Sequence, residues 1–145
     1  FPYTTLFRSL VMVTMTLTLG EDCLVRCNDK DAGQILKNLM ENAIKYNVLH
    51  GQVDVTTRRV GDQVTLSVAD TGVGIPEADM PRIFERFYRV DKARSRAAGG
   101  TGLGLSIVRD AVKRHGGEIT VQAGQPAGTI FTVTLPAWTG EGETT

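Results

Sequence analysis

Hydrophobic and polar residues alternate along several stretches of this chain, a pattern typical of half-buried β-strands. Two of these stretches are separated only by Gly61-Asp62, so they are predicted to form an antiparallel hairpin. The last two stretches also lie close together along the chain and predict a second hairpin. The predicted strands cover residues 11–19, 24–27, 52–60, 63–70, 118–123 and 129–135.

Hydrophobic residues recur at helical spacing in two longer segments. The first runs from about residue 29 to 46, with Asn28 as its N-cap and acidic residues in its first turn. The stripe of this helix that is expected to face a core consists of Ile35, Leu36, Leu39, Met40, Ala43 and Ile44. A second helix is predicted over residues 103–114, and its expected core residues are Leu105, Ile107, Val108, Ala111 and Val112.

A short helix is predicted to begin at Pro81 and to pass through Ile83. Its spacing would place Phe84 and Phe87 on one side, as core residues. Residues 88–101, which follow, are basic, small and glycine-rich and show no periodicity. A loop of this length in a compact domain is usually functional, so a lid is expected here that is poorly ordered without its ligand.

The order of the predicted elements gives an α+β fold, a two-layer sandwich in which helices cover one face of a mixed, mostly antiparallel sheet. A doubly wound parallel fold does not fit, because strands and helices do not alternate strictly. At 145 residues the chain is long enough for one domain with a substantial core. We assign that domain to residues 11–136 and treat 137–145 as a flexible tail. Residues 1–10 are excluded as a non-native or linker segment, since they fit nothing that follows.

Lys plus Arg equal Asp plus Glu at 16 each, so the net charge favours neither a nucleic-acid nor a membrane partner. Cys23 and Cys27 lack a second pair at zinc-site spacing, and we interpret them as reduced thiols of a cytoplasmic protein. No apolar run reaches the roughly 18 residues of a membrane helix. Between Arg82 and Arg96, however, six basic residues outnumber two acidic ones. This positive charge directly precedes a glycine-rich loop where an anion could bind.

Two glycine-rich segments carry the candidate chemistry. Gly99-Gly100-Thr101-Gly102-Leu103-Gly104 runs into a predicted helix, and backbone N–H groups at such a junction bind phosphates. Asp70-Thr71-Gly72-Val73-Gly74 ends a strand and fixes one carboxylate beside a loop that allows close backbone approach. The alternative for the second segment is an ordinary Asx-turn. Neither a P-loop lysine nor a dinucleotide-binding unit accompanies them.

The first long helix also carries a separate polar stripe, which consists of Gln34, Asn38, Asn42 and Lys45. Asparagine is a mediocre helix former, so two asparagines in mid-helix on one face require a reason. On spacing alone, the simpler interpretation is a solvated helix face.

These motifs together resemble the catalytic, ATP-binding domain of sensor histidine kinases, within the wider ATPase family that includes gyrase, Hsp90 and MutL. Residues 34–46 resemble the N box, 70–76 the G1 box, 82–91 the F box and 100–105 the G2 box. The resemblance covers about residues 11–136, nearly the whole domain. It implies the Bergerat-type ATP-binding fold, with ATP and Mg²⁺ as cofactors.

The resemblance implies a role for each matching residue. Asn42 is expected to coordinate Mg²⁺ through its side-chain oxygen. Asp70 is expected to accept a hydrogen bond from the exocyclic amine of adenine. The other implied contacts are Asn38, Lys45, Tyr46 and Arg89 around the phosphates, Gly72, Gly74 and Ile75 near the base, and Gly100, Thr101, Gly102, Leu103 and Gly104 as the phosphate cradle. The implied catalytic set is Asn38, Asn42, Lys45 and Arg89.

Asn38 indicates the reaction class within this resemblance. ATP-hydrolysing relatives carry a glutamate four residues before the metal asparagine, where it serves as a general base, and an asparagine cannot accept a proton. The expected acceptor is therefore a histidine, because a neutral imidazole needs no base. His50 and His115 lack the flanking residues of a phosphoacceptor helix. The phosphoacceptor histidine is expected on a dimerisation domain absent from this sequence.

The expected partners are ATP, the phosphoacceptor histidine domain of the parent kinase and, indirectly, a response regulator, with no nucleic acid. The fragment is expected to be monomeric and cytoplasmic, and its parent a homodimer anchored in the bacterial inner membrane. Two alternatives stay open, an ATP-hydrolysing conformational switch of the gyrase/Hsp90 type and a non-catalytic nucleotide-binding module. Residues 47–52 replace the usual Thr/Ser-Pro-x-Gly-Gly run, which is expected to alter a connector and not the site.

Overall fold

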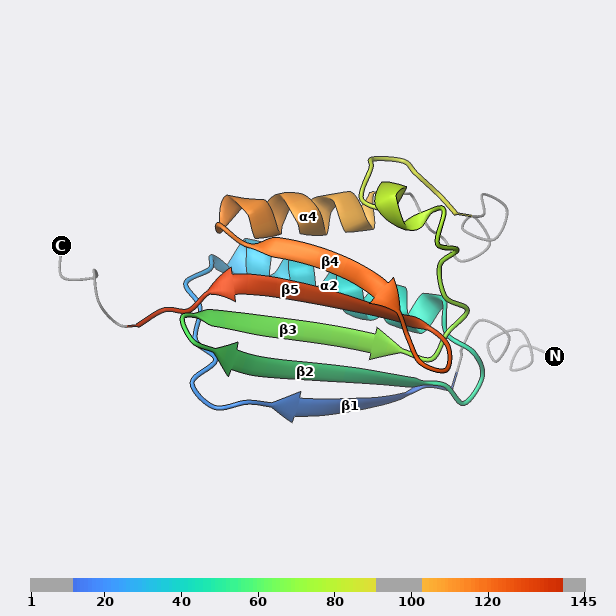
Figure 1. Cartoon of the computed structure of the whole chain (residues 1–145), viewed down its shortest axis with the longest axis horizontal. Helices are drawn as coiled ribbons and strands as arrows, with labels where there is room; N and C mark the ends of the chain where they lie inside the picture. The colour runs from blue at the N-terminus through green and yellow to red at the C-terminus, as the bar shows by residue number, and fades with distance from the viewer. Residues whose placement is uncertain (1–11, 91–102, 140–145) are drawn as a thin grey trace, which may run out of the picture.

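The computed structural model describes residues 12–90 and 103–139 of the chain. Five strands form one sheet in the order β1-β2-β3-β5-β4 (Figure 1). β1 pairs in parallel with β2, and every other neighbouring pair is antiparallel. The strands are β1 (Thr14–Leu19), β2 (Gln52–Val60), β3 (Gln63–Asp70), β4 (Glu118–Ala123) and β5 (Thr129–Pro136). The predicted α+β fold with a mixed, mostly antiparallel sheet is confirmed.

Two helices, α2 (Asp29–Lys45) and α4 (Gly104–Arg114), pack against each other on one face of this sheet (Figure 1). α2 begins where predicted, because the side-chain oxygen of Asn28 accepts a hydrogen bond from the backbone N–H of Asp31 at 2.8 Å. α4 ends before Gly116, whose φ of +73° favours glycine. The buried core between the two layers consists of Ile35, Leu39, Ala43, Val53, Val55, Val68, Ile83, Val108, Ala111, Val112, Phe131 and Val133.

The predicted burial is wrong for four hydrophobic residues. Leu36 and Ile44 of α2 are exposed. Leu17 and Leu19, which belong to the hydrophobic set of the half-buried strand predicted over residues 11–19, are also exposed in β1. The helices pack mainly over β3, β4 and β5, so β1 lies at the sheet edge beyond most of their cover (Figure 1). The alternating pattern identifies a strand, but its burial depends on which neighbours the fold supplies.

Two of the shorter predicted elements differ from the structure. The strand predicted over 24–27 is a single antiparallel bridge between Val25 and Ala137. The bridge lies where the chain leaves β5, because the backbone N–H of Trp138 donates to the carbonyl of Leu24 at 2.7 Å. Among the described residues, the segment 24–27 forms no β-bridge other than this one, so it does not form the predicted strand.

The short helix predicted from Pro81 is one 3₁₀ turn, η1 (Met80–Arg82). Phe84 packs edge-on against Phe131, with 6.2 Å between ring centroids. Phe87 is 69% exposed and has a φ of +66°, so the prediction that both aromatic residues share a core-facing side is wrong. Helical spacing does not apply there, because the helix ends after one turn.

Most of the predicted lid lies outside the described residues, and so do Gly100, Thr101 and Gly102 of the predicted phosphate cradle. Residues 1–10 and the last residues of the predicted tail are also outside them. Among the residues that the structure describes, no helix is long and apolar enough to cross a membrane.

Candidate functional site

Three of the sequence motifs meet at one end of the molecule. The C-terminal end of α2, the loop that follows β3 and the N-terminal end of α4 lie at the same side of the fold (Figure 1). α2 and α4 run in opposite directions along the sheet, which brings the start of α4 beside the second half of α2. The candidate site is therefore built from segments that lie far apart in the sequence.

The carboxylate of Asp70 is held at the end of β3 in a buried position. Asp70 is 9% exposed, and its Oδ1 accepts a hydrogen bond from the backbone N–H of Gly72 at 2.8 Å. Burial raises the pKa of Asp70, while the backbone N–H groups of Gly72 and Thr129 act in the opposite direction by donating to the carboxylate. A carboxylate has room for about four hydrogen bonds, so this one can accept a further donor from a ligand.

The loop after Asp70 is fixed against the end of α2, and the contact requires glycine at position 72. A Cβ placed on Gly72 would lie 2.3 Å from the carbonyl oxygen of Tyr46. The same carbonyl accepts a hydrogen bond from the backbone N–H of Val73 at 3.1 Å. Gly74 has a φ of +76°, which also favours glycine. Ile75, the next predicted site residue, packs against the core.

The polar stripe of α2 leads from this loop towards α4. The side-chain amide of Asn38 donates to Gln34 at 3.4 Å, and a Cβ placed on Gly104 would lie 3.9 Å from Asn38 Oδ1. Tyr46 follows Asn38 by eight residues, or about 12 Å of helix. The side chains of Asn42 and Lys45 make no hydrogen bond or ion pair with the described residues.

The N-terminal end of α4 presents backbone N–H groups near Asn38. Leu103, the residue before the helix, provides no side-chain cap. The hydroxyl of Ser106 donates to the carbonyl of Leu103 at 2.8 Å and therefore does not serve the free N–H groups of the first turn. These N–H groups, together with the helix dipole, favour an anion.

Among the described residues, Arg89 has no hydrogen bond or ion pair to another predicted site residue. Its guanidinium makes no hydrogen bond or ion pair within residues 12–90 and 103–139. The preceding Tyr88 donates its hydroxyl proton to Asp79, and the guanidinium of Arg82 lies 4.7 Å from the centre of the Tyr88 ring. Hydrogen bonding to Asp79 raises the pKa of Tyr88. These contacts join two residues of the F-box segment, Arg82 and Tyr88, to each other and to the nearby Asp79.

Sequence reasoning missed a glycine that lies behind Asp70. Gly128, in the loop before β5, has a φ of +91°, and a Cβ on it would lie 1.8 Å from the carbonyl oxygen of Asp70. Thr129 then pairs with Asp70 across the two strands. The glycines at 124 and 128 mark a turn in the sequence, but nothing local identifies the strand end that the turn approaches.

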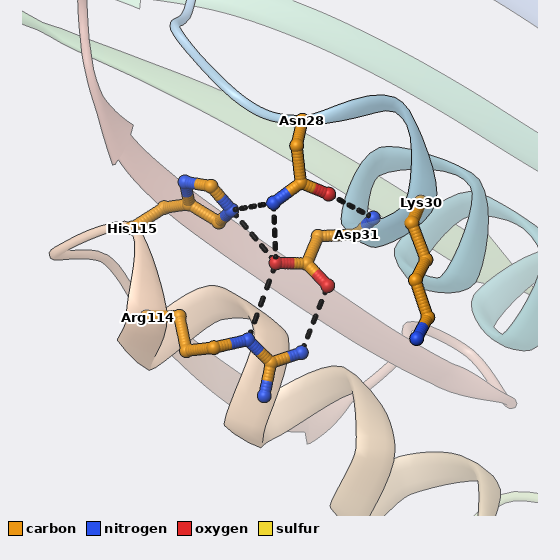
Figure 2. A pocket seen from close by; sticks show the side chains of 5 residues that line it. All are labelled: Asn28, Lys30, Asp31, Arg114 and His115. Carbon is orange, nitrogen blue, oxygen red and sulfur yellow. Dashed lines mark hydrogen bonds and ion pairs between the residues drawn. The ribbon is translucent and has the colours of Figure 1, made fainter.

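A second polar cluster lies at the opposite end of α2 (Figure 2). Asp31 is buried, and its carboxylate accepts hydrogen bonds from Arg114 Nη2 at 2.8 Å and Arg114 Nε at 3.2 Å. Nε2 of His115 lies 2.9 Å from the same carboxylate, and Asn28 Nδ2 donates to it at 3.1 Å. Lys30 lines the same pocket without joining these bonds (Figure 2). The cluster joins the start of α2 to the end of α4.

We expect Asp31→Asn to lower the free energy of unfolding at pH 7. Hydrogen bonds from Arg114 and His115 hold the pKa of Asp31 well below its usual range. The ionised carboxylate therefore stabilises the fold above the unfolded-state pKa of about 3.9, and this contribution is lost as the pH falls below that value. Urea unfolding should show a clear difference between the wild type and the variant at pH 7 and a smaller one at pH 3. The control variant Asp54→Asn, at an exposed position, should show little difference at either pH. A difference that is equal at both pH values would contradict the expectation.

Comparisons with known proteins agree with this geometry. The sequence profile of the family described as "Histidine kinase-, DNA gyrase B-, and HSP90-like ATPase" matches residues 27–139. The chain is 42% identical over 117 residues to the sensor histidine kinase WalK of Bacillus subtilis, which covers 79% of this chain and 19% of WalK. The chain thus spans about a fifth of the length of that relative.

Solved structures with the same fold include those of two histidine kinases. The mycobacterial sensor histidine kinase MprB matches with a TM-score of 0.74 and 32% identity, over 86% of this chain and 83% of that one. The catalytic domain of the histidine kinase ThkA matches with a TM-score of 0.75 and 28% identity, over 93% of this chain and 86% of that one. The resemblance predicted from the four boxes is confirmed. The chain belongs to the histidine kinase-, DNA gyrase B- and HSP90-like ATPase family, and it is an ATP-binding catalytic domain of the sensor histidine kinase type.

Proposed function

We propose that this domain binds Mg-ATP along α2 and transfers the γ-phosphoryl group to a histidine on another domain of its parent kinase. The buried carboxylate of Asp70 carries the proposal. It is a hydrogen-bond acceptor that backbone amides fix in place, in a loop that contacts the C-terminal end of α2, the helix with the polar stripe. Adenine would donate its exocyclic amine to Asp70. Guanine has a carbonyl at that position and would offer no donor.

The phosphates would extend from Asp70 along α2 towards the start of α4. Asn42 lies between the two ends, and its amide oxygen is a hard, neutral ligand that suits Mg²⁺ bound to phosphate oxygens. The side chain of Asn42 is free of other contacts within the described residues, which fits such a role. Bound Mg²⁺ would neutralise charge on the phosphates. Asn38, Lys45 and the N–H groups at the start of α4 would hold the phosphate oxygens, and Gly104 leaves room beside Asn38.

Phosphoryl transfer at this site would rely on positioning instead of a general base. Asn38 cannot accept a proton, so a water molecule bound there would not be activated. A neutral imidazole nitrogen can attack the γ-phosphorus directly, forming a P–N bond as the bond to the β-phosphate oxygen breaks and ADP leaves. The imidazole then loses its N–H proton to solvent.

The histidine would come from a phosphoacceptor domain outside this chain. His115 is engaged with Asp31, and His50 is an exposed residue of the loop between α2 and β2. ThkA has also been solved in complex with the response regulator protein TrrA, at 25% identity and a TM-score of 0.71 over 96% of this chain and 38% of that one. A response regulator would accordingly act downstream of this kinase. We place the domain in the cytoplasm, with its parent a homodimer anchored in the inner membrane.

Mixing this domain with a separately produced phosphoacceptor domain and γ-labelled ATP tests the proposal. We expect acid-labile phosphohistidine on the acceptor and a dependence on Mg²⁺. Asn42→Ala should reduce Mg-ATP affinity by about 10-fold or more, since even outer-shell partners of a bound metal contribute about 10- to 100-fold. Glu41→Ala, an exposed neighbour on the same helix, should leave affinity unchanged.

Two other outcomes would overturn the proposal. Steady ATP hydrolysis by the isolated domain, without transfer to histidine, would favour a conformational switch of the gyrase/Hsp90 type. Failure of the folded domain to bind ATP with Mg²⁺ would favour a non-catalytic module.

A further inference from the structure

Asn47, the second residue after α2, is the buried polar side chain of a loop that the sequence suggested was only a connector. It is 7% exposed, and all of its hydrogen bonds are made inside the protein. Its Nδ2 donates to the carbonyl of Gln52 at 3.0 Å, and its Oδ1 accepts from the backbone N–H of Val48 at 2.8 Å. The same Oδ1 accepts from the hydroxyl of Thr71 at 3.1 Å. One side-chain amide therefore joins the end of α2, the start of β2 and the residue after Asp70.

Thr71 completes this connection. Its hydroxyl accepts from the backbone N–H of Gln52 at 2.8 Å while it donates to Asn47. The backbone N–H of Thr71 donates to the carbonyl of Gln52 at 3.1 Å. The site leaves no spare room, because a Cβ placed on Gly51 would lie 2.0 Å from Asn47 Oδ1. The position of Thr71 is thus determined by Asn47 and by the start of β2.

The position of Thr71 in turn determines the geometry around Asp70. Thr71 lies between Asp70, which carries the carboxylate, and Gly72, which donates to that carboxylate. The opposite side of the loop is anchored on α2 through Val73 and Tyr46. Asn47 follows Tyr46 directly, so it links the helix that would hold the phosphates to the loop that would read the base.

We propose that Asn47 is a positioning residue for base selectivity. It holds Thr71, and through Thr71 it fixes the distance and orientation of the Asp70 carboxylate relative to α2. This inference rests on the proposed function, since it assumes that Asp70 accepts the adenine amine. Loss of the Asn47 side chain frees the loop and allows the Asp70 carboxylate to move. A displacement of about 1 Å at a positioned group can lower the efficiency of an enzyme by about 100-fold.

The test compares the affinity for Mg-ATP with that for Mg-ITP, in which a carbonyl replaces the exocyclic amine. The wild type should prefer ATP. Asn47→Ala and Thr71→Val should each reduce that preference by about 10-fold or more, with the dissociation constant for ITP nearly unchanged. Thr71→Ser retains the hydroxyl and should restore the preference. The double variant, with both Asn47→Ala and Thr71→Val, should lose no more of the preference for ATP than either single variant. Both substitutions remove the same hydrogen bond between Asn47 and Thr71.

Thermal unfolding of each variant separates positioning from general destabilisation. Asp31→Asn serves as the matched control, since it weakens a buried cluster at the far end of α2 and should keep the ATP preference. If Asn47→Ala does not fold, Thr71→Val decides alone, because it removes the same hydrogen bond from an exposed residue.

The outcomes distinguish the inference from the proposed function. A wild type that prefers ATP, together with variants that keep the preference or lose ATP and ITP affinity equally, would overturn the role of Asn47 alone. A wild type that binds ATP and ITP equally would overturn it together with the assignment of Asp70. A wild type that binds neither would overturn the proposed function as well.

Discussion

Asp70→Asn is expected to raise the dissociation constant of Mg-ATP by about 100-fold, or about 3 kcal/mol, in a domain that remains folded. The carboxylate accepts from Gly72 and Thr129 and would accept from adenine, whereas an asparagine must turn its NH₂ towards one of these donors. Isothermal titration calorimetry with Mg-ATP measures the loss.

The same substitution should leave the thermal midpoint unchanged or raise it. Burial raises the pKa of Asp70, so the ionised form is disfavoured in the folded state and destabilises the fold above that pKa. A neutral asparagine removes this effect at pH 7. Asp54→Asn provides an exposed control that should alter neither property. Full ATP affinity in a folded Asp70→Asn domain would contradict the assignment of Asp70 as the adenine acceptor.

Gly128→Ala is expected to destabilise the domain strongly and to weaken ATP binding in whatever folded protein remains. Its φ of +91° is strained for any residue with a Cβ, which alone costs about 1–3 kcal/mol. The new Cβ would also collide with the backbone of Asp70, because no flexible side chain is there to move away. Urea unfolding reports the loss of stability, and calorimetry reports the displacement of Asp70.

Gly33→Ala is the matched control for that substitution. Gly33 lies in α2, and a Cβ placed on it would have no neighbouring side chain or loop atom within 4 Å. Alanine there should stabilise the helix by about 0.5–1 kcal/mol and leave ATP binding unchanged. Equal effects of the two substitutions would show that the contact between Gly128 and Asp70 has no part in the site.

The elements that the sequence predicts well are those specified by local chemistry. The β2–β3 hairpin has its boundaries where alternation and Gly61-Asp62 place them. Asn28 caps α2 as its side chain predicts. By contrast, the exposure of Leu17 depends on how far two distant helices extend over the sheet, and the exposure of Phe87 depends on a helix that stops after one turn. Neither cause can be predicted from the residues next to Leu17 or Phe87 in the sequence.

The residues of the candidate site also differ in whether the local sequence predicts them. Asp70 and Gly72 could be found from the sequence, because a strand end followed by spaced glycines is a local pattern. Gly128 and Asn47 could not, since each acts on the Asp70 loop from a different part of the chain. The structure brings Asn38 and Gly104 together. Arg89, in contrast, has no hydrogen bond or ion pair with any residue that the structure describes. The roles of these residues towards ATP remain the predictions tested above.

The pairing of Asp70 with Thr129 also bears on how the domain assembles. The β2–β3 hairpin closes across two residues, whereas η1, α4 and β4 lie between β3 and β5 along the chain. Contacts between residues so distant in the chain form slowly, because a long loop must close first. We therefore expect the amide of Thr129 and the close approach of Gly128 to reach Asp70 late in folding. A nascent chain that has not yet made β5 would lack a complete acceptor for the base, so nucleotide binding would report on completed folding.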